Sequence, residues 1–240
     1  MQSLSERLGT LMVGCFICAG VPAQTSTTPS KVKTAFASTA VSAVTLNGTF
    51  VSIEGSLRQA GDVHLSAGSD GTYSILLGKQ SGAAGEKRTL SAPSAECTWN
   101  DSRGDNFPID PYNCQTPTWF LPLLPTLLSS QSSPEWKIDA VGKSDASFHL
   151  LFTHISTTGS SDQPVGAGPA LDVEVSNESF LPTKANFVMY TENSSRPRLS
   201  VEVQYQDYRL VNGVNVPFRI KRFVNGTLVL DITVTNASAI

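Results

Sequence analysis

The stretch DYRLVNGVNVPFRIKRFVNGTLVLDITVT, residues 207–235, has two Asn-Gly steps set between runs of alternating apolar and polar residues. An Asn-Gly step flanked by such runs is the strongest short-range signal of a β-hairpin, because both residues tolerate the positive φ that its turn requires. Alternation with a period of two places the apolar residues on one face of a strand. The stretch therefore predicts three consecutive antiparallel strands with one apolar face.

The loop at the second Asn-Gly step sets the register of the last two strands. A two-residue loop at Asn225-Gly226 would place Lys221 opposite Leu230 and mix charged with apolar side chains on both faces. We predict instead a three-residue loop that begins at Val224, with Gly226 in the left-handed position of a β-bulge, because this keeps the two faces apart. The predicted register pairs Ile220 with Leu230, Phe218 with Ile232, Val216 with Val234 and, on the opposite face, Arg219 with Asp231.

The same test predicts an even-length loop at the first Asn-Gly step, Asn212-Gly213. Val201, Val203 and Tyr205 then join the apolar face of Phe218 and Ile220, and Gln204 and Gln206 lie beside Lys221 and Arg219 on the polar face. Pro217 has no amide donor, so we expect an irregularity or a missing partner there. An antiparallel sheet with one apolar face must curl on itself or take a cover.

Most of the chain before this stretch is also typical of strands. Segments such as TFVSIEGSL, SFHLLFTHI and ALDVEVS alternate in polarity and are separated by Gly, Asn, Pro, Ser or Asp. Residues 118–131, TWFLPLLPTLLSSQ, are apolar at almost every position and predict one short helix or two turns. We therefore predict a mainly β protein, in which residues 45–240 form a single domain. Its strongly curved antiparallel sheet, or incomplete barrel, has one or two short apolar helices covering the open face.

The N-terminus is typical of a secretion signal. The apolar run LGTLMVGCFICAGV is too short to span a bilayer, and Val21-Pro22-Ala23 supplies small residues for cleavage. We expect residues 1–23 to be a signal peptide and residues 24–44 to be a tether and short helix. The mature protein would then be periplasmic or secreted. The alternative is a lipoprotein signal, with Cys15 as the acylated and anchored residue.

Removal of the signal leaves two cysteines, Cys97 and Cys114, at the ends of a segment rich in Pro, Asp and Asn. In an oxidising compartment such a pair predicts a disulfide. A zinc site is the alternative, but the two cysteines are far apart and no histidine lies between or beside them. We expect the disulfide, which would also position the apolar segment that begins at Thr118.

Residues that could carry chemistry are few. His64, His149 and His154 lie on predicted strands without a cysteine or carboxylate at ligand spacing, and the sequence has no phosphate-loop, dinucleotide or Gly-x-Ser-x-Gly motif. Charged residues make up 15% of the chain and the formal net charge is -3, which offers no basic surface to nucleic acid. We expect no enzyme activity, no metal, no cofactor and no nucleic-acid partner.

The stretch from Asp207 to Ile220, followed by Asn225-Gly226 and by Asp231 to Val234, resembles bacterial LolA-like envelope proteins. The resemblance is best over residues 199–235 and concerns only the architecture over residues 45–198. The superfamily includes carriers of outer-membrane lipoproteins. The resemblance implies an incomplete, strongly curved antiparallel barrel with helices over its open mouth.

A half-barrel with an apolar inner surface and an apolar cover is a site for acyl chains, since each buried methylene contributes about 0.8 kcal/mol. The cover would consist of Trp119, Phe120, Leu123, Leu124, Leu127 and Leu128, and part of the wall of Phe218, Ile220, Leu230 and Ile232. The same residues also fit a filled core without a cavity. We predict a non-catalytic envelope protein that binds an acyl chain or the lipid of a lipoprotein. The alternative is a structural or sensory envelope module that contacts a protein partner and has no small-molecule ligand.

Overall fold

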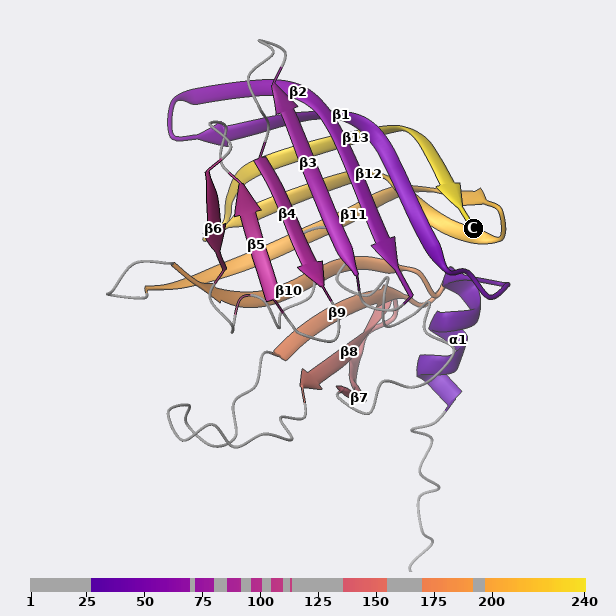
Figure 1. The fold of residues 1–240 in the computed structure, drawn as a ribbon. Helices are drawn as coiled ribbons and strands as arrows, with labels where there is room; N and C mark the ends of the chain where they lie inside the picture. Colours follow the sequence, from indigo (N-terminus) through magenta and orange to yellow (C-terminus); the bar gives the residue numbers. More distant parts are fainter. Residues whose placement is uncertain are drawn as a thin grey trace, which may run out of the picture.

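The computed structural model describes residues 27–69, 72–79, 86–91, 96–100, 105–109, 113, 136–154, 170–191 and 197–240. This part of the chain contains one α-helix and thirteen strands that form one antiparallel sheet (Figure 1). The helix is α1 (Thr27–Phe36), and the strands are β1 (Ala43–Glu54), β2 (Leu57–Gly68), β3 (Tyr73–Lys79), β4 (Glu86–Ser91), β5 (Glu96–Asn100), β6 (Asn106–Pro108), β7 (Trp136–Lys143), β8 (Ser147–His154), β9 (Ala170–Ser176), β10 (Pro182–Tyr190), β11 (Arg198–Val211), β12 (Val214–Val224) and β13 (Thr227–Ala239). The predicted mainly β fold is confirmed.

The order of the strands shows two meanders joined in the middle of the sheet. β1 to β6 follow one another across one half, and β13 back to β7 follow one another across the other. The first and last strands, β1 and β13, pair antiparallel from Val44 opposite Ala239 to Ser52 opposite Leu230. β6 and β7 are therefore the two edges, and residues 109–135 connect one edge of the sheet to the other.

The first hairpin, between β11 and β12, has the predicted register. Asn212 and Gly213 form a two-residue loop with φ of 48° and 85°, and Val211 pairs with Val214. This places Tyr205 opposite Ile220, Gln204 opposite Lys221 and Gln206 opposite Arg219, as expected. An even-length loop is thus confirmed.

The expected irregularity near Pro217 is also confirmed. Pro217 lies opposite Tyr208, and the neighbouring Asp207 has a φ of 56°. The pairing of β12 with β13 runs from Arg219 to Val224, so Pro217 lies beyond it and needs no donor on that side.

The second hairpin, between β12 and β13, differs from the prediction. Its loop is the two-residue Asn225-Gly226, with φ of 49° and 78°, and Val224 pairs with Thr227. The register then shifts between Phe223 and Arg222, because Val229 is an extra residue in β13. The three-residue loop that we predicted is wrong.

The predicted pairs of this hairpin are wrong for the same reason. Ile220 lies opposite Ile232 and not Leu230, and Arg219 lies opposite Thr233. The predicted contact of Arg219 with Asp231 is present nevertheless, because Arg219 Nη2 forms an ion pair with Asp231 Oδ2. The predicted pairs of Phe218 with Ile232 and of Val216 with Val234 are absent as well. A bulge inside the strand and an odd-length loop have the same effect on which face each side chain takes, so the pattern of faces cannot distinguish them.

The buried side chains form one core on the face of the sheet that carries Leu65, Val203 and Ile220, here called the inner face. Figure 1 shows the sheet curving strongly round one side, which is the curvature expected from the sequence. The largest fully buried side chains are Phe152, Leu65, Ile75, Leu150, Leu171, Ile220, Ile232, Val32, Val44 and Val173. They come from both meanders, so the two halves of the sheet share one core.

Helix α1 packs at the end of the sheet where the β11–β12 hairpin turns (Figure 1). Its Val32 and Phe36 are 0% and 3% exposed, and its residues contact β12 and the edge strand β7. Asn215 Nδ2 donates a 2.7 Å hydrogen bond to the carbonyl oxygen of Ala35, and Ala37 forms a β-bridge with Val214 directly after the helix. α1 therefore covers part of the inner side. The apolar segment 118–131, which we predicted as the cover, lies outside the described residues.

Candidate functional site

The four residues predicted as the wall of a ligand site share the inner face. Phe218, Ile220, Leu230 and Ile232 are 7%, 1%, 6% and 2% exposed and belong to the common core. In this structure they pack against other apolar side chains. The predicted cover residues Trp119, Phe120, Leu123, Leu124 and Leu127, together with Cys114 and the side chain of Cys97, lie outside the described residues.

An aromatic pair lies at the β6 edge of the inner face. Trp99 on β5 and Phe107 on β6 are directly opposite one another, and the chain of pairs through β4 and β3 puts them on the same face as Ile75 and Leu65. Their rings stack with centroids 4.9 Å apart, and Phe107 is still 39% exposed. The inner face thus has an exposed aromatic side chain, Phe107, at this edge.

Arg222 is the one buried charged residue among those that the structure describes, with 6% exposure. It lies between Val203 and Leu230 on the inner face, and its Nη2 donates to Met189 Sδ at 3.2 Å. Sequence reasoning missed it. The signal was available, because Arg222 continues the alternation of Phe218 and Ile220 and must point to the same side.

Three tyrosines gather on the inner side. Tyr205 is 4% exposed, and Tyr208 Oη donates a 2.8 Å hydrogen bond to the carbonyl oxygen of Pro182. Burial raises the pKa of Tyr205 well above its ordinary value, and the charges of Tyr208 and Tyr73 raise it further. Burial also raises the pKa of Tyr208. Both phenols of β11 are therefore protonated at neutral pH, and each O–H group has a proton that it can donate.

Asn113 attaches the connection between the two sheet edges to β10. It is 4% exposed, its Nδ2 donates to the carbonyl oxygen of Tyr190 at 2.7 Å, and its Oδ1 accepts from the Tyr190 amide at 2.9 Å. A carboxamide that bonds both backbone groups of one residue replaces a neighbouring strand at that point. No local sequence signal identifies Asn113, since its partner is far away in the chain.

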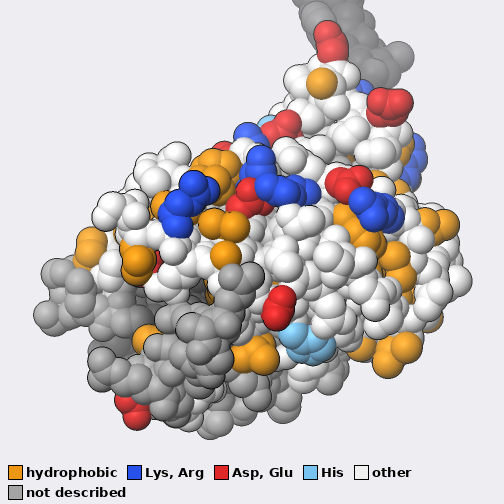
Figure 2. Space-filling model, turned by 90° about the horizontal axis from the view of Figure 1, so that it is seen from above, with side chains coloured by type: hydrophobic (Ala, Val, Ile, Leu, Met, Phe, Trp, Pro, Cys, Tyr) orange, Lys and Arg blue, Asp and Glu red, His pale blue; other side chains and the backbone are white. Residues whose placement is uncertain are grey.

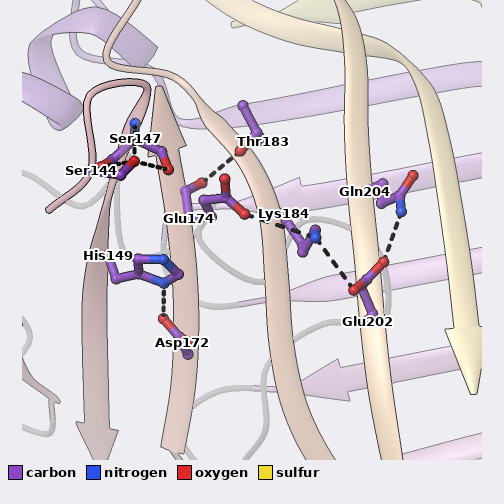
Figure 3. A network of polar contacts seen from close by, with 9 residues as sticks. All are labelled: Ser144, Ser147, His149, Asp172, Glu174, Thr183, Lys184, Glu202 and Gln204. Carbon is purple, nitrogen blue, oxygen red and sulfur yellow. Dashed lines mark hydrogen bonds and ion pairs between the residues drawn. The ribbon is translucent and has the colours of Figure 1, made fainter. Parts of the chain in front are cut away.

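The outer face carries a ladder of charged and polar residues across four strands (Figure 3). Lys184 Nζ lies 3.8 Å from Glu174 and 3.5 Å from Glu202, and Gln204 donates to Glu202 at 2.7 Å. Figure 2, seen from above Figure 1, shows acidic and basic side chains lying among uncharged ones on the face that it presents. Partly exposed pairs of this kind contribute little to stability and keep the outer face soluble.

His149 lies in the same surface and has a carboxylate partner that the sequence spacing did not reveal. Its Nδ1 is 2.9 Å from Asp172 Oδ1, because β8 and β9 pair side by side. His64 Nδ1 is 2.7 Å from Asn47 Oδ1, beside a shallow depression of about 350 Å³ on the outer face. Among the described residues no group of three or more His, Cys, Asp or Glu side chains is placed to hold a metal ion.

No helix within the described ranges is long and apolar enough to cross a membrane.

A solved structure shows the fold of this chain, whereas sequence comparisons find no match. No protein-family model and no curated protein matches the sequence. Among solved structures, a LolA superfamily protein from Nitrosomonas europaea aligns over 88% of this chain and 91% of its own, with a TM-score of 0.54 and 11% sequence identity. This likeness shows that the chain has a LolA-like fold, as the resemblance of residues 207–235 predicted.

Two further structures align over a similar length with lower scores. One is a putative outer membrane lipoprotein-sorting protein domain from Vibrio parahaemolyticus, with a TM-score of 0.47, 10% identity and coverage of 88% of this chain and 90% of that one. The other is a DUF1329 family protein from Desulfovibrio piger, with a TM-score of 0.46, 7% identity and the same coverage of the two chains.

Proposed function

We propose that this protein, whose fold is LolA-like, is a non-catalytic protein of the bacterial envelope that binds an acyl chain or the lipid of a lipoprotein against the inner face of its sheet. The fold is the one associated with lipoprotein carriers. A secretion signal over residues 1–23 would deliver the chain to the periplasm or the exterior, and acylation at Cys15 is the alternative.

The observation that carries the proposal is the apolar core of the inner face together with an aromatic pair at the β6 edge of the same face. Beyond the buried core, the inner face also carries the stacked Trp99 and Phe107 at the β6 edge, on the far side of the Arg88 position of β4, and Phe107 is exposed there. An acyl chain that lies along such a surface gains about 0.8 kcal/mol for each methylene that it buries. Aromatic faces at the rim of an apolar site are well suited to hold such a chain.

The proposal assigns roles to the predicted site residues. Phe218, Ile220, Leu230 and Ile232 are the wall, and a ligand would reach them by displacing apolar side chains that now pack there. Trp119, Phe120, Leu123, Leu124 and Leu127 are the proposed cover. The connection that contains them joins the two edges of the sheet.

Mass spectrometry of the natively purified protein tests the proposal directly. Lipid that copurifies after gentle extraction, and uptake of a fluorescent fatty acid by lipid-free protein, are the expected results. A clean mass of the protein alone, with no uptake of the fatty acid, would contradict the proposal and favour a module that contacts only a protein partner.

Two exposed apolar residues provide a matched pair of variants. Phe107 is 39% exposed on the inner face, and Leu76 is 42% exposed on the outer face, opposite His64. Phe107→Ser should weaken fatty-acid binding about fivefold, since an aromatic contact contributes roughly 1 kcal/mol. Leu76→Ser should leave binding unchanged. Equal effects of the two changes would place the ligand elsewhere.

A further inference from the structure

The hydroxyl of Tyr205 is buried in the core and has no hydrogen-bond partner among the residues that the structure describes. Tyr205 lies on the inner face of β11, directly opposite Ile220, and is 4% exposed. Buried polar groups in folded proteins nearly always have a partner, and each exception calls for an explanation. A phenol in an apolar wall is such an exception.

The surroundings of Tyr205 show that packing does not require the hydroxyl. The inner face has phenylalanine rings at other buried positions, namely Phe50, Phe152, Phe187 and Phe218. Tyr208, three residues later on the same strand, differs from Tyr205 because its Oη donates to the carbonyl oxygen of Pro182. A phenylalanine at position 205 would fill the same space and avoid the cost of an unmade hydrogen bond.

The chemistry of the missing partner follows from the state of the phenol. Because burial keeps Tyr205 protonated, its Oη has a proton to donate, and the partner is a hydrogen-bond acceptor. An uncharged acceptor is favoured at this position, since burying a charge costs far more than burying a carbonyl. The carbonyl of an acyl ester satisfies both conditions and arrives attached to a hydrocarbon chain.

We propose that Tyr205 Oη donates a hydrogen bond to the ester carbonyl of an acyl chain bound against the inner face. The inference rests on the proposed function and names the class of ligand: a neutral acyl ester is preferred over a plain hydrocarbon of equal length. The apolar side chains that cover the hydroxyl in the structure move aside when the ester enters.

Two probes of equal chain length separate this hydrogen bond from apolar contact. Methyl palmitate and hexadecane are each used to displace a fluorescent fatty acid from the full-length protein. Tyr205→Phe should weaken the binding of methyl palmitate about threefold to tenfold and leave hexadecane unchanged, since it removes one hydrogen bond. The melting temperature of Tyr205→Phe should equal or exceed that of the wild type.

Tyr208→Phe is the matched control. It removes a hydroxyl that has a partner, so it should lower the melting temperature and leave the ratio of the two affinities unchanged. If Tyr205→Phe weakens both probes equally or neither of them, the ester contact is overturned while the acyl-binding proposal stands. If the wild type binds neither probe, the acyl-binding proposal itself fails.

The same variants distinguish two sources of the ester. A synthetic diacylated lipopeptide and phosphatidylglycerol in vesicles are each offered to the wild type and to Tyr205→Phe. The lipid whose uptake falls in the variant is the one whose ester carbonyl accepts the hydrogen bond from Tyr205. No fall with either lipid overturns the proposal.

Discussion

At the scale of single residues, two phenols of β11, the buried Tyr205 and the half-buried Tyr208, connect the stability of the fold to alkaline pH. The pKa values of Tyr205 and Tyr208 are raised by burial, whereas a tyrosine in the unfolded chain has a pKa of about 10. The stability that they contribute is therefore fully present below about pH 10. It is lost as the pH rises above that value, because the unfolded state releases these protons first.

We expect the free energy of unfolding to fall steadily between about pH 10 and pH 12. Urea unfolding at several pH values measures it, and the double variant Tyr205→Phe, Tyr208→Phe should show a shallower fall. The absorbance of phenolate provides a second measurement, since two of the five tyrosines should ionise only on unfolding. A wild type that titrates all its tyrosines near pH 10 while still folded would contradict the burial of these groups.

At the scale of elements, the pairing of β1 with β13 depends on a glycine. The register shifts there, so that Asn47 pairs with Asn236 and Gly48 pairs with Val234. A Cβ at Gly48 would collide with the backbone carbonyl oxygen of Thr233. A backbone group cannot rotate away as a side chain can, so the two strands would have to separate at this point.

Gly48→Ala should therefore lower the free energy of unfolding by about 3 kcal/mol, as overpacking against a backbone does. Gly78→Ala is the control, because a Cβ there lies 3.7 Å from the nearest atom, the Asp62 carbonyl oxygen. It should be neutral or stabilise the protein by up to about 1 kcal/mol, since Ala in a strand loses less entropy than Gly. Urea unfolding compares the two variants. Equal stabilities would show that β1 and β13 are not so closely packed.

At the scale of the whole molecule, the sheet consists of two meanders whose outer edges are connected only through residues 109–135. Asn113 in this connection is held to Tyr190 by two hydrogen bonds, at 2.7 Å and 2.9 Å. Cys114 is the residue directly after Asn113. The predicted disulfide between Cys114 and Cys97 of β5 would attach the same connection to the other meander. The two attachments together would restrain the connection from both sides.

Replacing Cys97 and Cys114 with serine should then lower the free energy of unfolding by about 2–5 kcal/mol, as the loss of a native disulfide does. Alkylation of the oxidised wild type under denaturing conditions tests whether the bridge exists, and two free thiols would disprove it. Asn113→Ala is the companion variant. It should lower the free energy of unfolding by about 1–3 kcal/mol with the bridge intact, because the part-buried backbone groups of Tyr190 lose their two hydrogen bonds to Asn113.

Local pattern was sufficient to predict the strands of residues 199–235, their apolar and polar faces and the first hairpin, because side-chain direction along a strand depends only on the parity of position. That parity put Phe218, Ile220, Leu230 and Ile232 on one face, and it also implied the curved sheet, since a one-sided sheet must hide its apolar surface. The sequence therefore determined the class of fold and the wall of the candidate site.

Tertiary structure alone decided which strands are neighbours and how they are offset. The bulge at Val229, the joining of β1 to β13 and the contact of His149 with Asp172 each bring together groups whose pairing is not encoded in either segment by itself. Tertiary structure also decides that the Tyr205 hydroxyl has no hydrogen-bond partner among the described residues, because this depends on the positions of all the elements around it. Faces follow from local geometry, whereas registers and partners follow from the energy of the complete core.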